Sequence, residues 1–303
     1  MRSFAELFAE AKRTGPRRVA LAGAADMESL EALAHAQGEG LVHPVLVGAA
    51  AKVGPLAEQA GLLEPELVDE PDLMLAAERA VRMVAAKDAD LVMKGQIGTA
   101  EILRAVLNKD WGLRTDGTLS HVAIIELPGY DRWILMSDGG VNIAPDLQRK
   151  AAITQNAIAT ALRLGIERPR VAILAGVEKV NPDMRSTVDA ALIAKMGERG
   201  QIKGGVVDGP LALDTAVDPA CAALKGLGGP VAGQADVLVV PDVESGNILY
   251  KTLVFMAMTA VATAGVIVGA RAPVVLLSRS DARDAKLRSL AFGVFLAGRP
   301  HIH

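Results

Sequence analysis

Residues 273–286, PVVLLSRSDARDAK, bring a hydroxyl, a guanidinium and carboxyl groups together directly after a short apolar run. The run at 274–277 is too short for a buried helix and follows a proline, which predicts a strand. Asp281 is expected to cap a helix, because apolar residues recur after it at positions 287, 290, 291, 294 and 295. A strand that ends in Ser278 and Arg279 and turns into a helix N-terminus suits the binding of an anion such as phosphate.

Five further segments have the same form, an apolar strand followed by a cluster of Gly, Asn, Asp, Ser or Lys. They are MKGQIG (93–98), MSDGGVNIAP (136–145), VEKVNPDM (177–184), VDGPLALD (207–214) and PDVESGNILYK (241–251). Each one alone is typical of a turn. Ligands of parallel α/β sheets bind beyond the carboxyl ends of strands, so together these segments predict a site.

The elements that must position these segments alternate between strands and helices. A first set has strands at 18–23, 45–48 and 89–93, with helices at 75–86 and 99–107, and a second set has strands at 170–175, 205–208 and 235–241 after a helix at 146–164. This alternation predicts right-handed βαβ units and mostly parallel sheets. Two strands between the sets, Ser120–Glu126 and 133–136, are expected to form a hairpin.

Length and composition favour an α/β protein with two domains. The chain has 303 residues, more than one core usually holds, and only 3% aromatic residues, which suits small side chains packed on parallel sheets. We expect a first domain of residues 1–143 plus 254–303 and a second of 144–253. The net charge of −3 argues against nucleic-acid binding. A single cysteine, Cys221, can form neither an internal disulfide nor a paired metal site, which favours a cytoplasmic location; Cys221 itself is expected in the core.

Two segments bear on targeting. The N-terminus alternates charges and apolar residues at helical spacing and lacks the continuous apolar core of a signal peptide. Residues 252–270 are uncharged and long enough to span a membrane. Ala, Thr and Gly dilute their hydrophobicity, and Gly265 divides them into a helix and a strand. We therefore expect buried core and no membrane span.

The ordered set of motifs between residues 91 and 297 resembles the phosphate acetyltransferase and phosphate butyryltransferase family, and is most similar to its butyryltransferase branch. The resemblance rests on KGQIGTAEILRAVL, GLRTDGTLSHVA, SDGGVNIAPDLQRKAAI, VEKVNPDMRSTVDAA, VDGPLALD, ADVLVVPDVESGNILYK and PVVLLSRSDARDAKL. It implies two α/β domains with the active site in the cleft between them and a homodimer or larger homo-oligomer. It also implies a reversible reaction in which acyl-CoA and phosphate give acyl phosphate and CoA, here with a short acyl group such as butyryl.

Acyl transfer to phosphate needs positive charge on the phosphoryl oxygens and a hydrogen-bond donor for the acyl oxygen. Arg279, and Arg104 on the helix after Lys94, can direct guanidinium groups at phosphate. In related acetyltransferases the Ser–Arg pair and an arginine matching Arg104 belong to the site. Ser278 is assigned to the acyl carbonyl or its oxyanion, since no histidine is near it in sequence and direct attack needs no acyl-serine.

The resemblance also implies a carboxylate, shortly after the Ser–Arg pair, that takes the thiol proton of CoA. Asp284 and Asp281 both remain candidates, because the acetyltransferase branch carries its acid one residue later, where this chain has Ala285. The other predicted phosphate or CoA contacts are Lys94, Asp138, Asn142, Asn181, Asp242, Asn247 and Lys251. His121 is expected to lie within its strand as a polar residue. CoA and phosphate are substrates; no permanently bound cofactor and no metal are expected.

Three alternatives remain. The enzyme could be specific for acetyl groups, or the chain could be a noncatalytic acyl-CoA-sensing module. A metal-dependent dehydrogenase of similar two-domain architecture would need clustered aspartates and a nicotinamide site. The sequence has no GxGxxG after an early strand and no dense aspartate cluster.

Overall fold

The computed structural model describes residues 1–256, 261–277 and 281–299. The chain forms two compact units, one built from Met1–Ser3 and Thr118–Thr263 and the other from Phe4–Gly117 and Ala264–Pro300. We call them unit 1 and unit 2.

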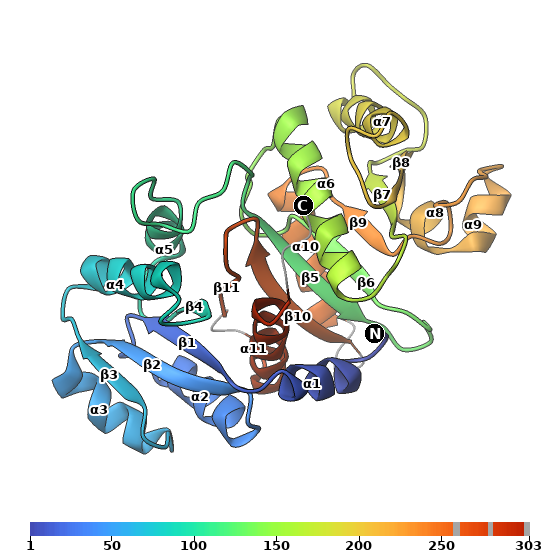
Figure 1. Cartoon of the computed structure of the whole chain (residues 1–303). Coiled ribbons are helices and arrows are strands. Elements are labelled where there is room, and N and C mark those ends of the chain that lie inside the picture. Colours follow the sequence, from blue (N-terminus) through green and yellow to red (C-terminus); the bar gives the residue numbers. More distant parts are fainter. Residues whose placement is uncertain (257–260, 278–280, 300–303) are drawn as a thin grey trace. The chain divides into compact units, whose positions relative to one another are not determined.

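Unit 2 is an α/β sandwich with a mostly parallel sheet (Figure 1). Its strands run in the order β3 (Glu66–Asp69), β2 (Val42–Gly48), β1 (Arg17–Ala22), β4 (Leu91–Lys94), β11 (Val274–Val275) and β10 (Ala262–Val268). Neighbours pair in parallel except β10 and β11. One layer of helices has the order α1 (Phe4–Arg13), α11 (Arg283–Ala297), α2 (Met27–Gly38) and α3 (Ala50–Gln59), in which each helix contacts the next. Helices α4 (Leu73–Ala86) and α5 (Thr99–Val106) contact each other. The predicted α/β class is confirmed.

Helix α11 is the central helix of unit 2. Its predicted apolar face is confirmed, and burial extends further, over residues 285–287 and 289–296. Gly293 marks its closest approach to the sheet, because a Cβ there would lie 2.7 Å from a methyl group of Val275 and 2.9 Å from one of Leu91. Helix α11 therefore packs on both β4, which precedes the segment of unit 1 in the chain, and β11, which follows it.

Glu10 joins α1 to the end of α11. Arg13 donates hydrogen bonds of 2.8 and 2.9 Å to the Glu10 carboxylate, and Arg299 donates one of 2.5 Å. The Arg13 hydrogen bond is the largest cause that lowers the pKa of Glu10 from 4.5 to about 2. The ionised carboxylate is therefore the form that the folded state favours.

Replacing Glu10 with glutamine should lower the melting temperature modestly at pH 7. A depressed pKa contributes stability above the unfolded value of 4.5 and loses it as the pH falls through about 2. The difference between wild type and Glu10→Gln should therefore shrink across this window. Circular dichroism melts at several pH values measure it, with Glu58→Gln, an exposed glutamate on α3, as control. A difference that stays constant down to the acid limit of the window would contradict the assignment.

Unit 1 contains the remaining five strands of the described chain (Figure 1). The strands β5 (Ser120–Glu126) and β6 (Ile134–Ser137) form the predicted antiparallel hairpin, and β6, β9 (Val237–Val239), β7 (Arg170–Leu174) and β8 (Val206–Leu211) follow in parallel. Helices α6 (Leu147–Arg163) and α7 (Arg185–Glu198) contact each other and the strands. The remaining helices are α8 (Leu213–Val217), α9 (Pro219–Leu224) and α10 (Val243–Met256).

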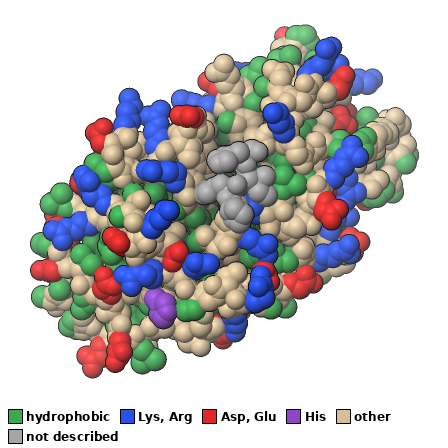
Figure 2. Space-filling model, in the orientation of Figure 1, with side chains coloured by type: hydrophobic (Ala, Val, Ile, Leu, Met, Phe, Trp, Pro, Cys, Tyr) green, Lys and Arg blue, Asp and Glu red, His purple; other side chains and the backbone are tan. Residues whose placement is uncertain are grey.

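For the described residues, the expectation that 252–270 are buried core is half right; residues 257–260 lie outside the described part of the chain. Residues 263–268 of β10 are buried, as predicted, but Phe255 and Met256 at the end of α10 are 56% and 76% exposed. An apolar run does not reveal whether its own chain covers it. Among the described residues, no helix combines the length and apolar character needed to cross a membrane. On the face drawn in Figure 2, basic and acidic side chains are interspersed.

Candidate active site

The predicted polar segments follow parallel strands within each unit. MKGQIG follows β4 of unit 2, and three of the others follow β6, β7 and β9 of unit 1. VDGPLALD (207–214) lies mostly within β8 (Val206–Leu211), which is longer than the predicted strand at 205–208, so only its last three residues follow the strand. Parallel strands end at the same edge of a sheet, so the segments of each unit share one edge. Each unit therefore presents its own set of polar strand ends.

In unit 2, the backbone of the loop after β4 lies directly against the backbone at the end of β1. The N–H of Gly95 donates to the carbonyl of Ala22 at 2.9 Å, and that of Gln96 to the carbonyl of Gly23 at 2.7 Å. A Cβ on Gly95 would lie 2.4 Å from the Gly23 oxygen. Only glycine fits at this crossing, which explains the first glycine of MKGQIG.

Lys94 holds this loop and places a positive charge at the strand end. Its ammonium donates to the carbonyl oxygens of Gly95 and Ile97 at 3.2 and 3.3 Å. β11 pairs in parallel with β4, with Val275 opposite Met93. The chain therefore leaves β11 from the edge at which Lys94 lies. Ser278 and Arg279 are outside the described residues.

Arg104 lies in the last turn of α5, the helix that follows this loop, and is exposed. No hydrogen bond or ion pair to another described residue holds its guanidinium. An exposed guanidinium can pair with a phosphate without first breaking an ion pair. Its place is compatible with the predicted role and does not test it.

The two candidate bases lie at the start of α11. Asp281 is half-buried, and Asp284 is exposed as the second residue of the helix. The prediction that Asp281 caps α11 is wrong: Ala282 occupies the cap position and the helix has no side-chain cap. The helix begins one residue later than the apolar pattern indicates. Asp284 therefore lies in the first turn of α11.

In unit 1, Asp138 organises the loop after β6. It is 3% exposed, and its Oδ1 accepts the N–H groups of His121, Gly140 and Val141 at 3.0–3.1 Å. Its Oδ2 accepts the backbone N–H of Asn142 at 3.0 Å and the side-chain amide of Asn142 at 2.5 Å. A second bond, from the same amide to the carbonyl of Leu119 at 2.7 Å, ties the loop to the residue before β5. The Asp138 carboxylate thus accepts five hydrogen bonds, and these hold the loop in place.

The start of α10 packs against the same loop. A Cβ on Gly246 would lie 2.9 Å from the Cα of Gly139, so the two backbones touch. Asn247 donates its side-chain amide to the carbonyl of Gly139 at 3.4 Å. Asp242 accepts the backbone N–H and the hydroxyl of Ser245 at 2.8 and 2.7 Å, as a helix cap does. The loop after β6 and the start of α10, which follows β9, are thus in contact, and we call this contact the joint between the ends of β6 and β9. Four predicted residues lie around it: Asp138, Asn142, Asp242 and Asn247.

Asn181 and Lys251 have different surroundings. Asn181 shapes the turn before α7: its Oδ1 accepts the N–H of Asp183 at 3.0 Å, and its own N–H donates to the hydroxyl of Thr187 at 2.9 Å. Lys251 is exposed on α10, with its ammonium 5.8 Å from the ring centre of Phe255. His121 lies in β5, as predicted, with its ring edge-on to Tyr250.

Sequence reasoning missed Lys225, which joins the ends of β7 and β8. Its ammonium donates to Glu178 at 2.8 Å and to Asp214 at 3.0 Å. These hydrogen bonds are the largest cause that lowers the pKa of both carboxyl groups. Cys221 was expected in the core but is only half-buried, because the short helix α9 lies at the surface; desolvation raises the pKa of its thiol.

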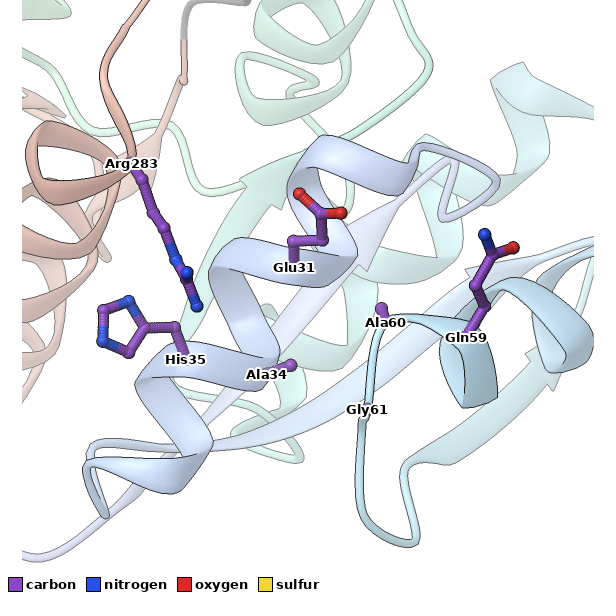
Figure 3. A pocket seen from close by; sticks show the side chains of 7 residues that line it. All are labelled: Glu31, Ala34, His35, Gln59, Ala60, Gly61 and Arg283. Carbon is purple, nitrogen blue, oxygen red and sulfur yellow. The ribbon is translucent and has the colours of Figure 1, made fainter.

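A hollow that no motif predicted lies on the helix layer of unit 2 (Figure 3). It is lined by Glu31 and His35 of α2, by residues 59–61 at the end of α3 and by Arg283 at the start of α11. Figure 3 shows Arg283 extending toward His35. Residues of three helices and of the turn after α3 line it, so it is separate from the strand ends described above.

The sequence matches the family model described as phosphate acetyl/butaryl transferase over residues 63–294. The chain is 43% identical over 300 residues to the phosphate butyryltransferase of Clostridium acetobutylicum, covering 98% of this chain and 99% of that protein. It is 41% identical over 295 residues to a phosphate acetyltransferase of Rhizobium meliloti, covering 97% and 93%.

A solved structure agrees with these sequence matches. The branched-chain phosphotransacylase of Enterococcus faecalis superimposes with a TM-score of 0.81 at 33% identity, covering 93% of this chain and 99% of that one. The chain therefore belongs to the phosphate acetyl/butaryl transferase family and is an acyltransferase that exchanges coenzyme A and phosphate on an acyl group.

Proposed function

We propose that this enzyme transfers a short acyl group, butyryl or one close to it in size, directly between coenzyme A and phosphate in a ternary complex. The observation that carries the proposal is the near full-length similarity to a phosphate butyryltransferase. The similar solved structure of a branched-chain phosphotransacylase also supports an acyl group larger than acetyl.

In the proposed reaction, a phosphate oxygen attacks the thioester carbonyl carbon. A C–O bond forms, the C–S bond breaks, and the CoA sulfur leaves and takes up a proton. Arg279 and Arg104 bind the phosphoryl oxygens, and Ser278 donates a hydrogen bond to the oxyanion. Lys94 lies at the end of β4, and the parallel strand β11 ends at the same edge of the sheet. The Lys94 ammonium therefore adds positive charge at that edge.

In the reverse direction a carboxylate accepts the CoA thiol proton, and we propose Asp284 or Asp281 for this role. Asp284 is exposed in the first turn of α11, and Asp281 is half-buried just before the helix. Comparing Asp284→Asn with Asp281→Asn in the thiol-consuming direction assigns the base.

The contacts in unit 1 are proposed for coenzyme A. Asn142 and Asn247 lie at the joint between the ends of β6 and β9, and Asp138 and Asp242 hold its two sides. Asn181 and Lys251 complete the proposed set. Coenzyme A and phosphate are the substrates, and no permanently bound cofactor is proposed.

We also propose a cytoplasmic homodimer or larger homo-oligomer. The cytoplasm supplies coenzyme A, and one cysteine without an internal partner suits a reducing compartment. We keep the predicted domain division, 1–143 plus 254–303 and 144–253, as a proposal; the two compact units divide at 3/4, 117/118 and 263/264.

A panel of acyl-CoA thioesters should separate the proposal from its alternatives. Phosphate-dependent release of free CoA thiol should be fastest with a four- or five-carbon acyl group, with kcat/KM at least about tenfold above acetyl-CoA, because each methylene in a fitted pocket is worth about tenfold or more. Turnover should be unchanged by EDTA. A preference for acetyl-CoA would indicate the acetyl-specific enzyme, and binding without turnover would indicate a sensing module.

A further inference from the structure

Lys286 is a charged residue on the buried face of α11. It is 8% exposed, and its neighbours in the helix, Ala285 and Leu287, are buried as well. Its ammonium donates to the Glu28 carboxylate of α2 at 2.7 Å. Glu28 lies in the first turn of α2, and Lys286 is the fourth residue of α11. This ion pair therefore joins the starts of two helices that pack against each other in unit 2.

Stability alone does not explain a lysine at this position. Burial of an ammonium has a desolvation cost that an ion pair often offsets only in part, so an apolar side chain of similar size is frequently at least as stable. The start of a helix also carries the positive end of the helix dipole, which repels a cation. Both effects disfavour Lys286, and they point to a role of its ion pair in fixing geometry.

The ion pair sets the rotation of the first turn of α11. Among the described residues, no side chain caps the start of this helix. At about 100° per residue, Asp284 is about 200° from Lys286 around the helix axis. Asp284 is exposed, whereas Lys286 is held inward by Glu28. The contact that holds Lys286 inward therefore also holds Asp284 outward, on the opposite side of the helix.

The other end of the ion pair is itself fixed to the strand ends of unit 2. Ser29, next to Glu28 in α2, is 3% exposed. Its hydroxyl contacts the carboxylate of Asp26, which follows β1, and lies 3.5 Å from the carbonyl oxygen of Lys94, which ends β4. Lys286 therefore connects the start of α11 to the edge of the sheet at which Lys94 places its positive charge.

We propose that Lys286 is a positioning residue of the acyl-transfer reaction, and that it acts by holding Asp284 in place through its ion pair with Glu28. This role rests on the proposed function, in which Asp284 is one of two candidates for the base that accepts the CoA thiol proton. Asp281 precedes α11 and lies outside the turn that Lys286 holds. A general base acts only within hydrogen-bond distance of its proton, so a small rotation of this turn lowers turnover.

Turnover in the thiol-consuming direction, with butyryl phosphate and coenzyme A as substrates, tests this role. Lys286→Met removes the ammonium and keeps a side chain of similar length. Its kcat should fall by about tenfold or more, while its melting temperature stays within about 3 °C of wild type. Glu28→Ala should lower kcat by a similar factor, because it removes the acceptor of the ion pair. Far-ultraviolet circular dichroism checks that each variant is folded.

Ser289→Ala is the matched control on the same buried face, one turn further along α11. It removes a hydrogen bond in which the Ser289 hydroxyl accepts the N–H of Gly265 at 3.0 Å. This variant should have a lower melting temperature and should keep kcat within about twofold of wild type, because the first turn of α11 keeps its ion pair. The control thus separates general loosening of the helix from loss of position at its start.

A double-mutant cycle with Asp284→Asn gives a readout that a purely structural role would not change. If Lys286 acts through Asp284, adding Lys286→Met to Asp284→Asn should lower kcat by no more than about a further twofold. Losses that multiply in the double variant would mean that Lys286 acts independently of Asp284, and would overturn the proposal.

The remaining outcomes distinguish the role of Lys286 from the proposed function. Wild-type kcat in Lys286→Met, in Glu28→Ala or in Asp284→Asn would overturn the positioning role and leave the acyl-transfer activity standing. An equal loss of kcat in Ser289→Ala would overturn it as well, because any loosening of α11 would then suffice. A wild-type protein that transfers no acyl group between phosphate and coenzyme A would overturn the proposed function and the positioning role together.

Discussion

Arg279→Ala should lower kcat/KM for phosphate by about one to three powers of ten, with folding unchanged. The expected loss is that of a charged contact that strengthens as negative charge develops on the transferring group. Arg279→Lys keeps the charge but loses the planar fork of donors, so its activity should fall between those of wild type and the alanine variant. Initial rates of CoA thiol release at varied phosphate concentration give kcat and the KM for phosphate of each variant.

Arg283→Ala is the matched control for this prediction. Arg283 is an exposed arginine at the start of α11, four residues after Arg279, and it lines the hollow with His35. Its removal changes the net charge by the same amount and should leave kcat/KM within about twofold, because general electrostatic attraction is weak next to a direct contact. Equal losses in both variants would mean that net positive charge alone matters, and wild-type kinetics for Arg279→Ala would refute the phosphate role.

The order of strands, helices and polar strand ends was predictable because local patterns carry it. The β5–β6 hairpin, the apolar face of α11 and the placing of MKGQIG after β4 all follow from spacing and from turn residues. These features depend on residues that are neighbours in the chain, so one sequence is enough.

What could not be predicted depends on residues that meet only in the folded chain. The contact of Gly139 with Gly246 joins residues more than a hundred positions apart, and nothing in either segment reveals it. Lys225 follows a short surface helix, and its link to Glu178 exists only because β7 and β8 pair. The cap of α11 was misplaced by one residue, since helix ends are set by tertiary packing as well as by capping side chains.

Asp138→Ala should lower the free energy of unfolding by about 3 kcal/mol, because its buried carboxylate accepts five hydrogen-bond contacts and the alanine leaves their donors without an acceptor. The loss is less than the sum of five bonds, since water can enter the enlarged loop. Asp138→Asn keeps the shape but turns one acceptor into a donor that faces N–H groups, so it should also destabilise. Urea unfolding followed by circular dichroism gives both values.

Asp146→Ala sets the scale for that experiment. Asp146 is exposed and accepts a single N–H, from Arg149 at 2.8 Å, as the cap of α6. Its loss should cost about 1 kcal/mol. An Asp138→Ala variant no less stable than Asp146→Ala would show that the loop after β6 holds together without the carboxylate. If Asp138 positions Asn142 for coenzyme A, the KM for acyl-CoA should rise in Asp138→Asn at temperatures where the variant is fully folded, whereas Asp146→Ala should keep the wild-type KM. A purely structural Asp138 would change stability and leave that KM unchanged.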